Sequence, residues 1–165
     1  MKRVRIQQGK VGLVFKNGDY KKVITEGVSW LSFSEKVIQY DVFSMLNTYV
    51  PLEILLKDEK LATMLDVIEV KDNELVIVYE NDNFKTILQA GRHLYWKGFI
   101  NRTFTKIDVS KIYITESIDK ALFANYELTK HIRVFEVFSY EKAVLLVDDV
   151  YTKTLTGGTY RFWKK

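Results

Sequence analysis

The order of apolar and polar residues predicts a strand-rich chain. An apolar run at residues 75–79 leads into a turn at 80–83, a second run opened by Phe84, and an aromatic-rich run after Gly91. Two apolar arms joined by residues that tolerate a positive φ predict a β-hairpin, and the run after the glycine predicts a further strand.

The same arrangement occurs once before this segment and once after it. Moving back by 64 residues brings Gly91 to Gly27, and moving forward by 67 residues brings it to Gly158, with the apolar runs in step. Internal repetition of this length predicts one small structural unit that is used three times.

Residue types that accept left-handed backbone occupy equivalent points of each copy. A glycine that recurs after each hairpin predicts a backbone angle that only glycine reaches at low cost. The predicted structural turn residues are Asn17, Gly18, Gly27, Asn81, Gly91, Asp148 and Gly158.

Two short helices are predicted after the strands of the first two copies. Asp58 and Asn125 fall in register and are strong N-cap residues, so each is expected to start the second helix of its copy. The predicted fold class is therefore α+β, with antiparallel sheets in tandem strand-rich repeat modules. Each module contains a β-hairpin, two further strands and two short helices.

The predicted modules are residues 1–66, residues 67–133 and a partial third module at residues 134–165. The third copy stops at Lys165, where a strand equivalent to residues 103–109 is expected. Either the third copy is a cap that closes the sheet, or the chain has been cut from a longer one. The second alternative is favoured, because an apolar strand ending at Trp163 would be left with an exposed edge.

The composition restricts the class of protein. Hydrophobic residues make up 47% of the chain and aromatic residues 14%, which is enough for a packed interior, and cysteine is absent. Disulfides and thiol chemistry are therefore excluded. We recognise no signal peptide and no apolar segment long enough for a transmembrane helix. The net charge of +4 comes from interspersed basic and acidic residues, so no nucleic-acid binding is expected.

The sequence offers no constellation typical of catalysis, of metal binding or of a cofactor site. His93 and His131 lie outside any metal-ligand frame. We therefore expect a protein that is not an enzyme. The aromatic residues either pack within the strands or face a protein partner or lipid headgroups. The candidate partner or lipid surface comprises Trp96, Phe99, Phe162 and Trp163.

The start of the chain resembles the opening of the SPFH (band-seven) domain of stomatin-like proteins, the slipins. The resemblance is carried by the strand at residues 8–15, the Gly18-Asp-Tyr20 hairpin, the Glu26-Gly27 turn and the strand at residues 37–42. The third copy looks like the same opening. The chain departs from the family pattern where Glu26, Ala90 and Gly157 replace a proline, and it lacks the family's membrane hairpin and helical half.

The resemblance implies a non-catalytic, membrane-associated scaffold or protein-interaction module of a bacterial slipin. Its partners would be other proteins and a membrane lipid surface, and the full-length protein would form homo-oligomers. It would lie in the cytoplasm or at the periphery of the inner membrane, with residues 134–165 at the start of an SPFH-like domain. A β-rich module that binds a small ligand or nucleic acid is the alternative.

Overall fold

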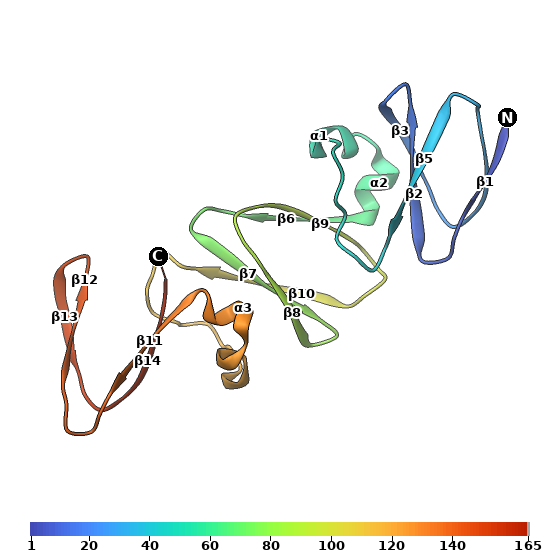
Figure 1. Ribbon diagram of the computed structural model, residues 1–165. Helices are drawn as coiled ribbons and strands as arrows, with labels where there is room; N and C mark the ends of the chain where they lie inside the picture. Colours follow the sequence, from blue (N-terminus) through green and yellow to red (C-terminus); the bar gives the residue numbers. More distant parts are fainter. Residues whose placement is uncertain (165) are drawn as a thin grey trace.

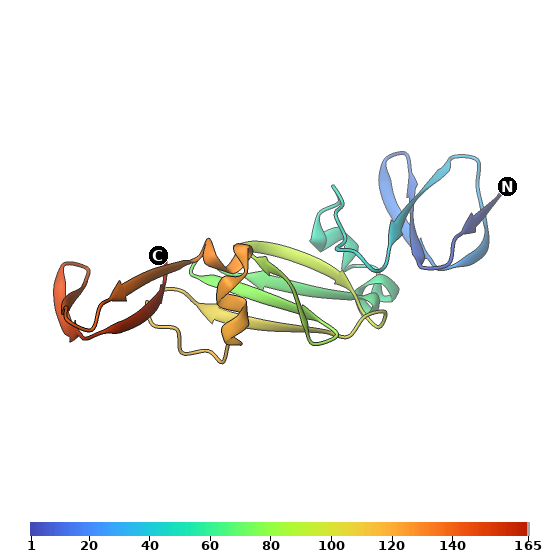
Figure 2. The ribbon, with the colours of Figure 1, turned by 60° about the horizontal axis from the view of Figure 1, so that its bottom comes forward.

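The computed structural model describes residues 1–164 and shows an elongated molecule. Three groups of strands follow one another along its length (Figures 1 and 2). The first group contains β1 (Lys2–Ile6), β2 (Lys10–Lys16), β3 (Asp19–Ile24), β4 (Gly27–Leu31) and β5 (Glu35–Asp41), followed by α1 (Leu52–Leu55) and α2 (Glu59–Met64).

The second and third groups contain the remaining elements. The second consists of β6 (Leu65–Val70), β7 (Glu74–Glu80), β8 (Asn83–Leu88), β9 (Gly91–Trp96) and β10 (Arg102–Asp108), with the 3₁₀ helix η1 (Lys120–Ala124) and α3 (Tyr126–Thr129). The third consists of β11 (Ile132–Val137), β12 (Ala143–Val147), β13 (Val150–Leu155) and β14 (Gly158–Trp163).

All strand pairs between the named strands are antiparallel. The first group forms a β1-β4 pair and a β3-β2-β5 sheet, and the second forms a β6-β9 pair and a β8-β7-β10 sheet. The third forms the pairs β11-β14 and β12-β13. The predicted antiparallel, strand-rich fold is confirmed. The helices are four to six residues long, so the fold is mostly β.

The pairing registers of the three groups coincide when the sequence is shifted by 64 and 67 residues. Ile6 pairs with Gly27, Val70 with Gly91, and Val137 with Gly158. The hairpins share an irregularity at the same point, after Val14, Val78 and Leu145. The two strand pairings that all three groups contain therefore have the same register.

The hairpin turns use left-handed backbone at both central residues. The φ angles are 53° at Asn17, 85° at Gly18, 50° at Asn81 and 50° at Asp148. This backbone matches the twist of the flanking strands, and asparagine, aspartate and glycine adopt it most readily. The residues that follow the hairpins also have positive φ angles, which are 114° at Gly27, 134° at Gly91 and 155° at Gly158.

The predicted helix caps are confirmed. Asp58 Oδ1 accepts hydrogen bonds from the backbone N–H groups of Lys60, at 3.0 Å, and Leu61, at 3.3 Å. Asn125 Oδ1 accepts one from the N–H of Glu127 at 2.9 Å. Each cap satisfies donors that the first turn of a helix leaves without a partner.

The predicted module boundaries fall inside strands. β6 starts at Leu65 and β11 at Ile132, before the predicted module starts at residues 67 and 134. Both side chains are buried in the hydrophobic cluster of the preceding group. The strand therefore begins where the chain is still packing against the group before it. Lys165, the last residue of the predicted third module, lies outside the described residues.

The first strands of the first two hairpins, β2 and β7, are central in their sheets and are buried on both faces. Val11 and Leu13 of β2 belong to one hydrophobic cluster, and Val14 belongs to another. In β7, Ile77 and Val78 divide in the same way. Successive side chains point to opposite faces of a strand, so these continuous apolar runs reflect cover on both sides.

Candidate interaction surfaces

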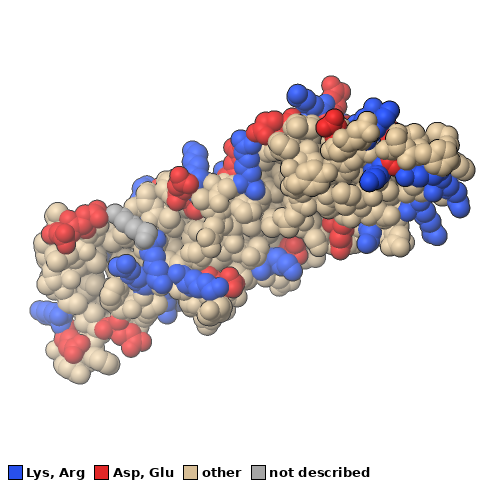
Figure 3. All heavy atoms as spheres, turned by 45° about the horizontal axis from the view of Figure 1, so that its top comes forward, with Lys and Arg blue, Asp and Glu red and all other residues tan. Residues whose placement is uncertain are grey.

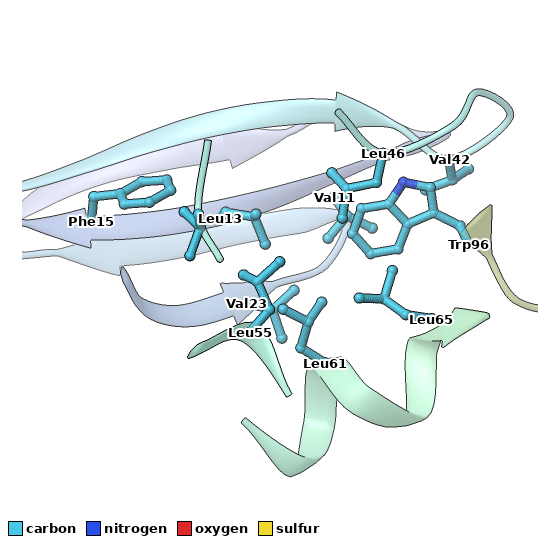
Figure 4. Close-up of a cluster of buried hydrophobic side chains, with 11 residues drawn as sticks. Val11, Leu13, Phe15, Val23, Val42, Leu46, Leu55, Leu61, Leu65 and Trp96 are labelled. Atoms are coloured by element: carbon cyan, nitrogen blue, oxygen red, sulfur yellow. The ribbon is translucent and has the colours of Figure 1, made fainter. Parts of the chain in front are cut away.

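Trp96 lies in the interior of the molecule. Only 1% of its surface is exposed, and it packs in one hydrophobic cluster with Val11, Leu61 and Leu65 (Figure 4). Trp96 belongs to β9 of the second group, whereas most of the cluster comes from β2, β3, α1 and α2 of the first. Its indole therefore closes the core of the preceding group.

Trp163 has the same role one group further along. It is also 1% exposed and packs with Leu75, Ile77 and Leu128 of the second group. Its Nε1–H donates to Glu116 Oε2 at 3.3 Å. Each tryptophan thus joins two neighbouring groups through a shared core.

The predicted surface at Trp96, Phe162 and Trp163 is wrong. Phe162 is also buried, with its ring centroid 5.9 Å from that of Tyr113 and 6.0 Å from that of Phe135. The alternation of side chains separates the two faces of a strand but does not show that a neighbouring group covers one of them. Trp96 and Trp163 hold neighbouring groups together and do not form an exposed surface.

Phe99 remains on the surface. It lies in the loop between β9 and β10, is largely exposed, and makes an edge contact with the ring of Phe43 at 6.3 Å. Of the four predicted aromatic residues it is the one with an accessible ring.

The outer face of the β1-β4 pair carries an exposed aromatic and cationic surface that the sequence analysis missed. Arg3 pairs with Trp30 and Arg5 with Val28, so the four side chains share one face. Trp30 is 58% exposed and Val28 is 48% exposed, and both arginines are exposed. We call this surface, formed by Arg3, Arg5, Val28 and Trp30, the Trp30 face.

The opposite face of the same strand pair is covered. Ile6 and Leu31 are each 1% exposed and pack against Val14 and Ile24 of the hairpin. Alternation therefore leaves the Trp30 face as the side turned to solvent. A signal for it was present in the sequence, because Ile6 and Leu31 are the apolar positions that match the buried positions of the later copies.

The counterpart of Trp30 in the second group is covered. Leu94 pairs with Val67 as Trp30 pairs with Arg3, and Leu94 packs against the core of the first group. At the position of Trp30, the second group is thus packed against its predecessor, while Glu69 and Arg92, the counterparts of Arg5 and Val28, are exposed. Among the described residues, no group covers this position in the first.

Basic side chains accompany the Trp30 face. Lysine and arginine side chains gather at the end of the molecule formed by the first group, while the rest of this view shows mixed charges (Figure 3). In the strand part of this group, residues 1–41, the basic residues are Lys2, Arg3, Arg5, Lys10, Lys16, Lys21, Lys22 and Lys36, and the acidic residues are Asp19, Glu26, Glu35 and Asp41. The segment with α1 and α2 adds Lys57 and Lys60 and the acidic residues Glu53, Asp58 and Glu59. The field at this end favours an anionic surface.

The strongest shift of a titratable group belongs to a structural hydrogen bond. The Tyr20 hydroxyl donates to Asp58 Oδ2 at 2.6 Å, which ties β3 to the cap of α2. Burial raises the pKa of Tyr20, and the hydrogen bond and the charge of Asp58 raise it further. The neutral phenol is therefore the form that holds the helix against the sheet.

Within residues 1–164, no cluster of three or more histidine, aspartate or glutamate side chains is placed to hold a metal ion. None of the helices in this part of the chain has the length and apolarity needed to cross a membrane. The chain matches no family model, no curated protein and no solved structure. The resemblance to the SPFH domain therefore stays a prediction.

Proposed function

We propose that this protein is a non-catalytic scaffold of the slipin type that contacts an anionic membrane surface through the Trp30 face. The scaffold consists of tandem strand-rich modules, and its further partners are other proteins. The observation that carries the membrane contact is the pairing of exposed Trp30 and Val28 with Arg3 and Arg5 on one sheet face.

The recurring register supports the tandem modules. The leading strand, the hairpin and the strand after the hairpin pair in the same way in all three groups. The fifth strand pairs with the first hairpin strand in the first two groups, as β5 does with β2 and β10 with β7. Such units share interfaces only with their neighbours and give an extended array.

The shared cores support a scaffold role. Trp96 and Trp163 each fill the core of the preceding group, so neighbouring groups are fixed to one another by buried apolar contacts. Large buried contacts restrict the relative motion of two units. The array then presents its ends at fixed positions, which suits a protein that organises other molecules.

The chemistry of the Trp30 face suits a membrane surface. Tryptophan is favoured at the boundary between lipid headgroups and acyl chains. A basic residue near an anionic membrane contributes about 1 kcal/mol of attraction. Stable membrane attachment needs more than one such signal, and this face combines an aromatic side chain with two arginines.

A vesicle flotation assay tests the proposal. The full chain is mixed with vesicles of zwitterionic lipid alone or with added anionic phosphatidylserine. We expect flotation with the anionic vesicles, reduced by raised salt because the arginine contribution is screened. Trp30→Ala and the double variant Arg3→Ala, Arg5→Ala should each reduce the floated fraction several-fold.

Tyr126→Ala is the matched control, because Tyr126 is an exposed aromatic residue beside Lys130 on α3, far along the chain from the Trp30 face. Its flotation should equal that of the unmutated chain. Flotation that is absent, or that falls equally in Trp30→Ala and Tyr126→Ala, would reject the membrane contact. Salt-dependent binding of a labelled oligonucleotide, without flotation, would favour the nucleic-acid alternative.

A further inference from the structure

The third hairpin has an open edge where the first two have a strand. β2 pairs with both β3 and β5, and β7 pairs with both β8 and β10, but within residues 1–164 β12 pairs with β13 alone. The hairpin itself is the same, because Ala143 pairs with Leu155 as Val76 pairs with Leu88. The edge that β10 covers on β7 is therefore presented to solvent on β12.

The backbone N–H and C=O groups that would bind an added strand can be identified from the β7-β10 pair. Asn81 N–H donates to Asn101 O at 2.8 Å and Val109 N–H to Asn73 O at 2.9 Å, at the two ends of the β7-β10 pair. Because antiparallel pairs alternate, the residues between them that face β10 include Ile77. In the identical register of the third hairpin, Val144 turns its N–H and C=O groups toward the open edge.

A hollow beside this edge lies at the position where an aromatic side chain packs in the second group. Its volume is about 200 Å³, and Phe135, Leu145 and Phe162 line it. In the second group, Phe104 of β10 lies opposite Val78, with its ring centroid 5.4 Å from that of Tyr95. Val78 and Tyr95 are the counterparts of Leu145 and Phe162, so the hollow is the position that Phe104 would take.

The other face of β12 is also uncovered. Val144 and Leu146 are exposed, as are Val150 and Tyr151 on the turn side of β13. An edge strand with open hydrogen-bonding groups and apolar side chains is a template for another strand.

We propose that β12 binds an extended polypeptide segment as an added antiparallel strand. The two strands that fill this position elsewhere in the chain define its chemistry. Each has an apolar residue opposite the counterpart of Leu145, which is Val14 in β2 and Val78 in β7. A second apolar residue follows three positions later, and then come aspartate and valine. The two examples are Val37, Tyr40, Asp41 and Val42 in the first group, and Phe104, Ile107, Asp108 and Val109 in the second.

The probe is a fluorescent synthetic peptide with the sequence of residues 101–109, added to the full chain. Anisotropy should rise and saturate with the unmutated protein. Val144→Pro removes a backbone donor from the open edge and should weaken binding at least tenfold. A scrambled peptide should bind at least tenfold more weakly than the probe.

Thr154→Pro is the matched control. Thr154 lies directly opposite Val144 and is exposed on β13. By the same alternation its N–H points to the outer edge of β13, an edge that β3 and β8 also leave open. Binding that is unchanged by Thr154→Pro supports the proposal, and an equal loss in both variants would overturn it.

A disulfide test fixes the register and also reports on weak binding, because the chain has no cysteine of its own. Val147 is the counterpart of Glu80, which lies opposite Arg102. The substitution Val147→Cys therefore places a thiol opposite position 102 of the bound peptide. In air-saturated buffer, with dissolved oxygen as the oxidant, a peptide with cysteine at position 102 should form the mixed disulfide faster than one with cysteine at position 103. Equal rates of disulfide formation for these two peptides and the scrambled one would overturn the proposal. Dimers of the chain that are lost in Val144→Pro would also overturn it, because a second copy would then occupy the edge of β12.

Discussion

The hairpins β7-β8 and β12-β13 pair their strands in the same register but differ in burial. Ile77 of β7 is 0% exposed, whereas its counterpart Val144 of β12 is 61% exposed. β7 is covered at its edge by β10 and on its face by α3 and Trp163. The described residues place no such elements on β12.

This difference teaches that the hairpin alone does not make a core. Both hairpins have an apolar first strand, β7 or β12, and turn residues with left-handed backbone. Burial depends on the elements that follow the hairpin and on the first strands of the next group. The stability of each group is therefore coupled to its successor.

The largest expected effect comes from removing the cover of β7. Trp163→Ala should lower the free energy of unfolding by about 3–5 kcal/mol, because it empties a buried site shared by two groups. Chemical denaturation measures this change. Trp30→Ala, which removes an exposed indole, should alter stability by less than about 0.5 kcal/mol. Equal effects of the two substitutions would contradict the assignment of Trp163 as a shared core residue.

The second prediction compares the hairpins directly. Ile77→Ala should destabilise the chain by about 2–5 kcal/mol, because the side chain is buried on a covered face. Val144→Ala should cost less than about 0.5 kcal/mol, since its side chain already meets solvent. Urea titrations of both variants give the two values. A cost for Val144→Ala close to that for Ile77→Ala would show that the third hairpin is covered after all.

The sequence predicted the local features of both hairpins and missed the contacts between groups. Turn residues such as Asn81 and caps such as Asn125 are decided by their own backbone, which is why they can be read locally. The burial of Trp96 and Trp163 depends on a neighbouring group. One signal was available, because Ser32 holds the equivalent position in the first copy, which follows no other copy in this sequence.

A smaller effect is expected at the cap of the helix that covers β7. Asn125→Ala removes the hydrogen bond to the N–H of Glu127 at the start of α3 and should cost about 1 kcal/mol. Thermal and urea unfolding measure it. Asn125→Asp keeps an acceptor at this position and should retain most of the stability, whereas equal losses in both variants would mean that the cap contributes nothing.

The smallest effect concerns pH. Burial lowers the pKa of His131, chiefly by desolvation, so the folded protein binds its proton less readily than the unfolded chain. Its contribution to stability is present above the unfolded pKa of about 6.5 and is lost as the pH falls through the folded value. Met64 is the counterpart of His131 in the first copy. His131→Met should therefore flatten the dependence of unfolding free energy on pH between about 7 and 5, and an unchanged slope would remove His131 as its source.

Amide hydrogen exchange, followed residue by residue by NMR, tests most directly whether the elements after a hairpin decide its burial. The account predicts that the Ile77 N–H, which faces β10, exchanges only on global unfolding, while the Val144 N–H at the open edge exchanges with little protection. Similar strong protection of both amides would contradict it.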